Sequence, residues 1–158
     1  MPISEKDLFD ARTAWGNRLI EISKIFETEG IEMATSVASD MIDNLYGFKF
    51  GKVLFKPTLS GGSQTFRPTK EGALSYFVGH NSAYPNDSGF GIKFWREINS
   101  DTSAIFIDDT VAMWMGWLGR VGAFRCRRGG GRHACSTSVM LESSTPWWRS
   151  VRSFVAGS

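Results

Sequence analysis

The chain contains little cysteine, little histidine and no long apolar run. Its 158 residues include two cysteines and two histidines, and two cysteines are too few for a disulfide scaffold. No stretch approaches the roughly 18 consecutive apolar residues of a membrane-spanning helix, so we predict no membrane partner. The first residues, MPISEKDLFDART, carry neither a basic nor an apolar segment. This argues against a secretory signal and favours a cytoplasmic or organellar location.

The scarcity of histidine and cysteine also argues against a metal centre. A zinc site takes four ligands, of which at least three come from the protein. Besides His80 the chain offers Cys126, His133 and Cys135, and the spacing of these three matches no structural zinc pattern. The chain also lacks the G-x-S-x-G motif of serine hydrolases and a phosphate-binding loop. We therefore predict no metal and no cofactor.

Charge is unevenly distributed along the chain. Residues 1–110 hold eleven basic and fifteen acidic residues, whereas residues 111–158 hold seven arginines, no lysine and one acid, Glu142. Beyond residue 118 the hydrophobic pattern follows neither a strand period nor a helix period. We predict an α+β domain at 1–118 and an atypical basic segment, rich in Arg, Gly and Trp, at 119–158. A reading-frame change and a genuine flexible tail explain this segment about equally well.

The basic segment contains one tract with the composition of nucleic-acid-binding proteins. Four arginines flank three consecutive glycines, and arginine contacts phosphate through its charge and stacks on bases. A single tract this short is weak evidence, so a nucleic acid is not the partner we expect. RNA binding remains a third hypothesis, and it rests on Arg125, Arg127, Arg128 and Arg132.

Two long helices are predicted at the start of the chain. Apolar residues recur at steps of three and four from Leu8 to Phe26, which is one face of an amphipathic helix. Ser4 and Asp7 resemble a capping box at its beginning. A second helix is predicted from about Ile31 to Tyr46, with Gly47 as a left-handed cap.

Strands dominate the pattern after the helices. Thr69 is placed to cap a short helix that ends at Gly79. Long helices followed by antiparallel strands predict an α+β fold, a curved antiparallel sheet packed against the N-terminal helices. The strands are predicted at Lys52–Phe55, Phe90–Ile98, Thr102–Ile107 and Val111–Leu118, and the last three are joined by hairpin-length links.

Two hydroxyl groups in the middle of the chain are candidates for a binding site. Thr58 follows a predicted strand, and Tyr76 lies on the short helix after it. Phe55, Phe77 and Phe94 are available to line an apolar cavity nearby. From chemistry alone, a threonine at this position is more often a turn residue and such a tyrosine more often a half-buried core residue.

Residues 13–118 resemble the iota-class carbonic anhydrases, small proteins related to the association domain of calcium/calmodulin-dependent kinase. The most specific strings are VLFKPTLS at 53–60 and ALSYFVG at 73–79. TAWG at 13–16, LYGF at 45–48, GFGIKFW at 89–95 and VAMWMG at 111–116 agree as well. The threonine of LFKPT precedes the tyrosine of SYFVG by 18 residues, and this pairing is specific.

The resemblance implies a cystatin-like, nuclear-transport-factor-like cone that is usually a homodimer. It implies reversible hydration of carbon dioxide to bicarbonate without a metal, with hydroxyl groups holding bicarbonate and positioning a water. Thr58 and Tyr76 match the threonine and tyrosine of that site, as both catalytic and substrate-binding residues. Oriented hydroxyl donors stabilise charge that develops on the oxygens of carbon dioxide.

The chain departs from the family at its end. The family closes with a strand bearing His-His-Ser-Ser-Leu-Pro, and this chain has no such string. LESSTP at 141–146 keeps two serines and a proline but lacks histidine, and we regard it as a coincidence. The departure predicts poor catalysis and an open edge on the Val111–Leu118 strand. The alternative is a non-catalytic dimerisation or small-ligand-binding module of the same fold.

Overall fold

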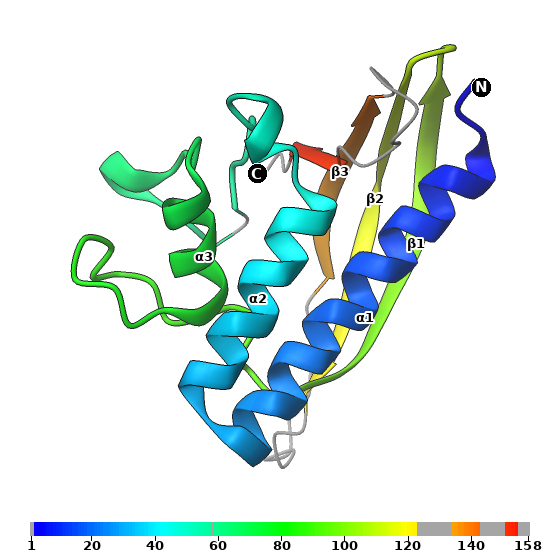
Figure 1. The fold of residues 1–158 in the computed structure, drawn as a ribbon. Helices are drawn as coiled ribbons and strands as arrows, with labels where there is room; N and C mark the ends of the chain where they lie inside the picture. The colour runs from blue at the N-terminus through cyan, green and yellow to red at the C-terminus, as the bar shows by residue number, and fades with distance from the viewer. Residues whose placement is uncertain (1, 58, 123–133, 143–150, 155–158) are drawn as a thin grey trace.

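The computed structural model describes residues 2–57, 59–122, 134–142 and 151–154, with backbone alone from residue 121 onward. These ranges contain three α-helices and a four-stranded sheet (Figure 1). The predicted α+β class is therefore confirmed. Among the described helices, none is both long and apolar enough to cross a membrane.

Helices α1 (Glu5–Glu29) and α2 (Ile31–Leu45) form as the apolar spacing predicts. Ser4 and Asp7 make the reciprocal bonds of a capping box, which satisfy backbone N–H groups left free at a helix start. Gly30 separates the helices at φ 85°, a conformation that favours glycine. The expectation of a left-handed Gly47 is wrong, because the chain leaves α2 through an extended Tyr46 and Gly47 has φ −82°.

The sheet has the order β1-β2-β3-β4, and all neighbours are antiparallel. Its strands are β1 (Trp95–Ile107), β2 (Val111–Gly122), β3 (Ala134–Glu142) and β4 (Val151–Phe154). Two separate strands at Phe90–Ile98 and Thr102–Ile107 were expected, and this is wrong. The polar link at 99–101 pairs with Gly119, Leu118 and Trp117 of β2, and a register shift near Thr102 bends one continuous strand.

The open edge expected on β2 is also wrong. β3 pairs with β2 from Val111 to Gly119, and β4 pairs with β3 in turn. Backbone groups alone make an antiparallel ladder, so residues without an alternating pattern can still supply a strand. The division of the chain at residue 118 stays a prediction.

The predicted strand at Lys52–Phe55 is an extended segment outside the sheet. Its side chains alternate as a half-buried strand would, since Val53 and Phe55 are buried. The backbone bond from Arg67 N–H to the Phe55 carbonyl, at 2.8 Å, joins it to the segment before α3 (Lys70–Val78). The alternating pattern therefore predicted which side chains are buried, but the predicted pairing of this segment as a strand is wrong.

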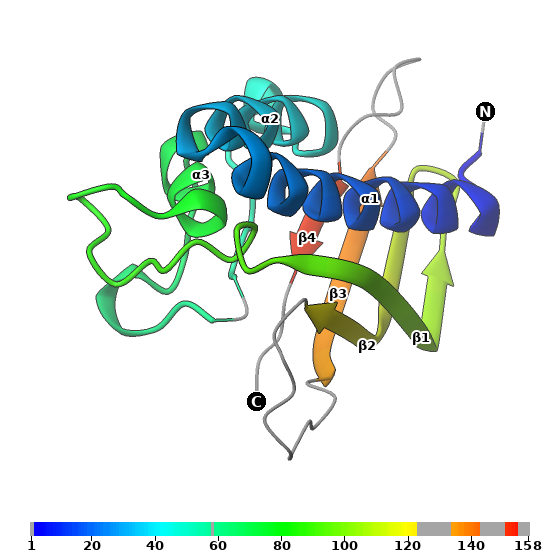
Figure 2. The same ribbon diagram turned by 90° about the horizontal axis from the view of Figure 1, so that it is seen from below.

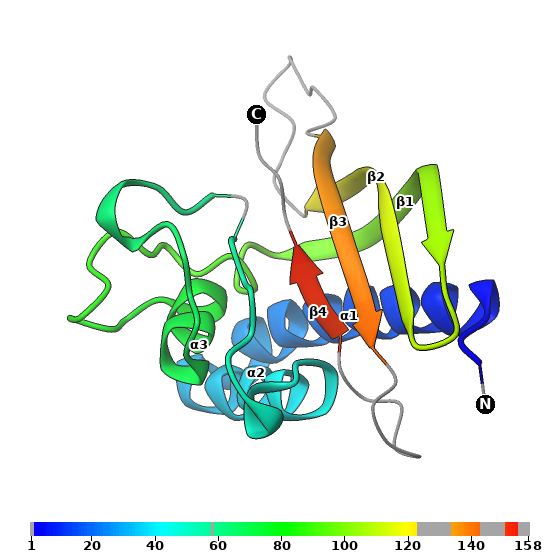
Figure 3. The same ribbon diagram turned by 90° about the horizontal axis from the view of Figure 1, so that it is seen from above.

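Helix α1 lies across one face of the sheet, α2 packs beside α1, and α3 packs on α2 (Figures 2 and 3). The buried side chains form two cores. The N-terminal cluster joins Leu8 of α1 to Ala112 and Trp114 of β2. The pocket-side cluster is larger and joins the rest of α1, α2, α3 and the following loop. Its buried members are Leu19, Ile22, Ala34, Ala38, Met41, Ile42, Tyr46, Val53, Phe55, Ala73, Tyr76, Phe77, Val78, Phe90 and Ile92.

Candidate active site

The short helix α3 carries Tyr76 into the pocket-side cluster. The Thr69 hydroxyl accepts the Gly72 N–H at 3.2 Å and begins the helix, as predicted. Gly79 ends it at φ 67°, also as predicted. Because most residues from Gly72 to Val78 are buried, packing on several sides determines where Tyr76 points.

The Tyr76 side chain is 7% exposed and is surrounded by aromatic rings. Its ring stacks on Phe90 with centroids 5.3 Å apart and meets Phe55 edge to face at 5.8 Å. Phe77 lies edge to face at 5.4 Å. Phe94 was expected in this group but packs instead on Phe26 of α1, at 5.9 Å. The predicted apolar surroundings of Tyr76 are therefore present, with Phe90 in place of Phe94.

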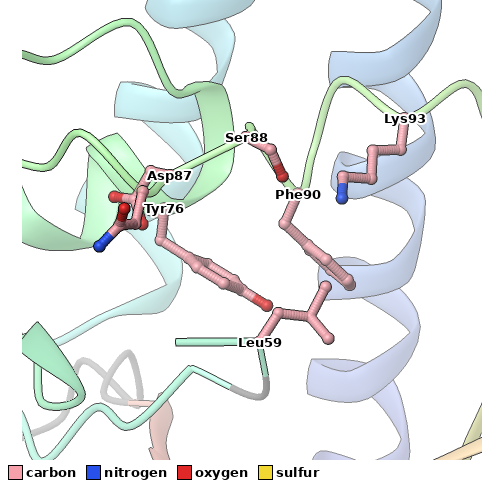
Figure 4. Close-up of a pocket in the computed structure, with 7 residues that line it drawn as sticks. Leu59, Tyr76, Asp87, Ser88, Phe90 and Lys93 are labelled. Carbon is pink, nitrogen blue, oxygen red and sulfur yellow. The ribbon is translucent and has the colours of Figure 1, made fainter. Parts of the chain in front are cut away.

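A small pocket opens beside the Tyr76 ring (Figure 4). Its volume is about 20 Å³, and a single water needs roughly 10–15 Å³. Such a space suits a molecule of very few atoms. The lining residues are Leu59, Tyr76, Asn86, Asp87, Ser88, Phe90 and Lys93.

The loop between α3 and β1 forms one wall of the pocket. Backbone bonds fasten this loop to α3: Phe90 N–H donates to the Tyr76 carbonyl at 2.8 Å, and Gly91 N–H donates to the Phe77 carbonyl at 2.7 Å. These bonds hold Phe90 against the tyrosine ring. The pocket therefore depends on two segments that are close in the chain and tightly joined.

A buried ion pair between Arg67 and Asp87 also fixes this loop. Arg67 donates to both oxygens of Asp87 at 2.8 Å, and the two side chains are 3% and 5% exposed. The Ser75 hydroxyl donates to Asp87 Oδ2 at 2.6 Å. The guanidinium also lies 4.4 Å from the centroid of the Tyr84 ring. Bidentate pairs of this kind add geometric specificity as well as energy.

The structure places one of the two predicted site residues. Tyr76 lines the pocket, whereas Thr58 lies outside the described residues, so a shared site for the two stays a prediction. Its neighbours are described: Pro57 is buried and Leu59 lines the pocket. The other candidates also lie outside the residues whose side chains the structure describes; they are Cys126, His133, Cys135 and the four arginines of the basic tract.

Sequence reasoning missed the polar residues of the loop. Asn86, Asp87 and Ser88 were interpreted as loop, and Lys93 as part of a strand. The only available signal was a cluster of Asn, Asp and Ser between glycines, which is typical of turns in general. They line the pocket because the backbone bonds of Phe90 and Gly91 hold the loop against α3.

Comparison with known proteins identifies the family of this chain. The family model described as metal-independent carbonic anhydrase matches residues 6–123. The chain belongs to this family. A metal-independent carbonic anhydrase of Nostoc sp. is 44% identical over 114 residues, which are 72% of this chain and 56% of that protein. The chain thus spans little more than half the length of this carbonic anhydrase.

A solved structure of the same class matches over nearly the whole chain. It is the iota-carbonic anhydrase from a cyanobacterium, complexed with bicarbonate, and it superposes with a TM-score of 0.89 at 32% identity. The match covers 99% of this chain and 94% of that one. The family resemblance inferred from VLFKPTLS and ALSYFVG is therefore confirmed.

Proposed function

We propose that this chain catalyses the reversible hydration of carbon dioxide to bicarbonate at the Tyr76 pocket. The observation that carries the proposal is a nearly buried tyrosine, 7% exposed, beside a pocket of about 20 Å³. Family membership and the bicarbonate complex of a solved relative support the choice of substrate.

The chemistry follows from the surroundings of the hydroxyl. Water adds its oxygen to the carbon of carbon dioxide, negative charge develops on the carbon dioxide oxygens, and a proton is released to solvent. A Tyr76 O–H donor stabilises that charge, and aromatic walls strengthen the interaction by excluding water. We assign Thr58 as the second hydroxyl donor, on its match to the family motif. The missing His-His-Ser-Ser string leads us to expect slower turnover than in relatives that have it.

Stopped-flow hydration with a pH indicator tests the proposal. Tyr76→Phe removes one donor with little change of volume and should lower kcat by roughly 100- to 1000-fold. Tyr84→Phe is the matched control, because Tyr84 lies on the loop that forms one wall of the pocket but does not itself line the pocket. An active wild type that Tyr76→Phe leaves unchanged would exclude this tyrosine.

Two further arms of the same assay separate the alternatives. Treatment with a strong chelator should leave the rate unchanged, and a rate that collapses and returns with zinc would contradict metal-independent catalysis. Bicarbonate binding without any hydration would favour the non-catalytic ligand-binding module.

We also propose that the chain forms a homodimer through the sheet face opposite the helices, in a cystatin-like cone. Along β2, Met113, Met115 and Trp117 are 38%, 47% and 53% exposed, while the residues between them are buried. Phe106 of β1, 60% exposed, is the cross-strand partner of Met113. A contiguous apolar face of this kind marks an interaction site.

Sedimentation velocity tests the dimer. Met115→Lys should convert a dimer to a monomer, whereas Phe66→Lys, at a residue 74% exposed outside the sheet, should not. A wild-type monomer at high concentration would contradict the proposal.

A further inference from the structure

The charge balance of the pocket differs from what its lining residues first suggest. The pocket contains one carboxylate, Asp87, and one ammonium group, Lys93. The carboxylate is bound on both oxygens by Arg67 and also accepts a bond from Ser75. Its negative charge is therefore compensated within the wall of the pocket.

Lys93 has no such compensation. Among the residues whose side chains the structure describes, no carboxylate forms an ion pair with its amino group. In Figure 4 the Lys93 amino group and the Ser88 hydroxyl extend toward each other beside the Phe90 ring. The pocket lining thus combines one ammonium group without an ion-pair partner and the neutral hydroxyl groups of Tyr76 and Ser88.

The backbone on both sides of Lys93 is anchored to α1. The buried Ser23 hydroxyl donates to the Gly91 carbonyl at 2.6 Å and accepts the Trp95 N–H at 3.0 Å. The Trp95 indole also donates to the Phe90 carbonyl at 2.6 Å. These bonds fix the residues before and after Lys93, so its side chain starts from a defined position at the pocket. A loop that is already ordered loses less backbone entropy when a ligand binds to it.

We propose that Lys93 is the anion-holding residue of this pocket and binds bicarbonate through a charge-assisted hydrogen bond. The inference rests on the proposed function for the identity of the anion. An uncompensated cation distinguishes bicarbonate, which carries a charge, from carbon dioxide, which does not. Lys93 therefore determines affinity for the anion, while Tyr76 stabilises the charge that develops during the reaction.

Binding can be measured without relying on catalysis. Sodium bicarbonate and sodium nitrate, a planar anion that does not react, are titrated at pH 8.5 and constant ionic strength into ¹⁵N-labelled protein. The Gly89 and Gly91 amides report binding by their NMR shifts. Lys93→Met should lower the affinity for both anions roughly tenfold or more, as expected for loss of a hydrogen bond to a charged group. Lys93→Arg should restore most of the affinity.

Lys6→Met is the matched control. It makes the same change of charge in the first turn of α1, where Lys6 pairs with Asp10, and it should leave anion affinity unchanged. A parallel assay should show a raised KM for bicarbonate in dehydration and a nearly unchanged KM for carbon dioxide in hydration.

The outcomes separate this inference from the proposed function. Anion binding that needs Lys93 in a protein that hydrates no carbon dioxide would uphold the inference and reject the activity. Active protein in which Lys93→Met binds both anions as wild type does would uphold the activity and overturn the inference. A wild type whose glycine amides respond to neither anion would also overturn it.

Discussion

An arginine lies against an aromatic ring near each of the two clusters, but the two guanidinium groups differ in their hydrogen bonds. Around α3, Arg67 is paired with Asp87, and Ser75 adds a further bond to the carboxylate. At the start of α1, the Arg12 guanidinium lies 4.5 Å from the centroid of the Trp114 ring. Its Nε is buried and has no hydrogen-bond partner among the described residues.

The Arg67 guanidinium thus has a charged partner, whereas the Arg12 guanidinium does not have all of its donors satisfied. Arg12 donates one bond to the Thr102 hydroxyl at 3.1 Å, and the Trp114 indole donates to the same oxygen at 2.9 Å. Burial lowers the pKa of the Arg12 guanidinium, and no carboxylate among the described residues opposes that effect. The network of Arg67, Asp87 and Ser75 is complete, and we expect the region around it to be the less tolerant of change. The pocket side also holds an unsatisfied arginine: the Arg120 guanidinium lies 5.0 Å from the centroid of the Phe90 ring, and its buried Nε has no hydrogen-bond partner among the described residues.

The largest effect is expected from breaking the buried ion pair. Arg67→Met leaves Asp87 buried without its partner, and removal of one member of such a pair costs about 3–5 kcal/mol. Urea unfolding measures the loss. Lys70→Met is the control, since Lys70 pairs with Asp43 at the surface, with side chains 40% and 55% exposed, and should cost less than about 1 kcal/mol.

The double variant Arg67→Met/Asp87→Asn sharpens this result. Replacing the charged partner removes the unpaired buried charge, so the double variant should be more stable than Arg67→Met alone. Equal losses for Arg67→Met and Lys70→Met would show that the two pairs do not differ as their burial indicates.

A pair of leucines on α1 compares the two clusters directly. Leu19 and Leu8 are 0% and 1% exposed, in the pocket-side and N-terminal clusters respectively. Core Leu→Ala changes cost about 2–5 kcal/mol, depending on how far the site can collapse. Leu19→Ala should lie near the upper end, because Leu19 belongs to the larger cluster, to which α2, α3 and the fastened loop contribute. Leu8→Ala should lie near the lower end, because the first turns of α1 can shift. A loss of stability for Leu8→Ala equal to or larger than that for Leu19→Ala would contradict the predicted difference between the two clusters.

The smallest effect is expected at the beginning of α1. Ser4→Ala removes the side-chain cap and should lower the free energy of unfolding by about 0.5–2 kcal/mol at pH 7. Hydrogen bonds from the Ser4 hydroxyl and Ser4 backbone lower the pKa of Asp7. The contribution of the ionised carboxylate is therefore present above its unfolded pKa of about 3.9 and lost as pH falls through its lower folded value.

The pH dependence provides the check on that prediction. In thermal unfolding, the difference in melting temperature between wild type and Ser4→Ala should become smaller from pH 7 toward pH 3. In an Asp7→Asn background the difference should not change with pH. A difference that widens in acid would mean that the cap and the carboxylate are not coupled.

Local patterns predicted the parts of the fold that depend on local physics. The spacing from Leu8 to Phe26 gave α1, and the caps at Ser4, Thr69 and Gly79 lie where the sequence places them. A helix start needs only nearby side chains to satisfy its free N–H groups, so its signal lies within a few residues. Tyr76 was predicted as a site residue from the family resemblance, and two of its ring neighbours, Phe55 and Phe77, were predicted from their positions in the sequence.

The sequence by itself determined the family, the helices and the presence of Tyr76 on a short, buried helix. Only the tertiary structure decided that Asp87 and Lys93 reach the same pocket and that one of the two charges is neutralised. Ser23 and Trp95 are separated by 72 residues, and Arg67 and Asp87 by 20. Bonds over such distances follow from how α1, α3 and the loop pack together. Since the loop itself has no hydrophobic period, nothing within it specifies where its charges come to lie.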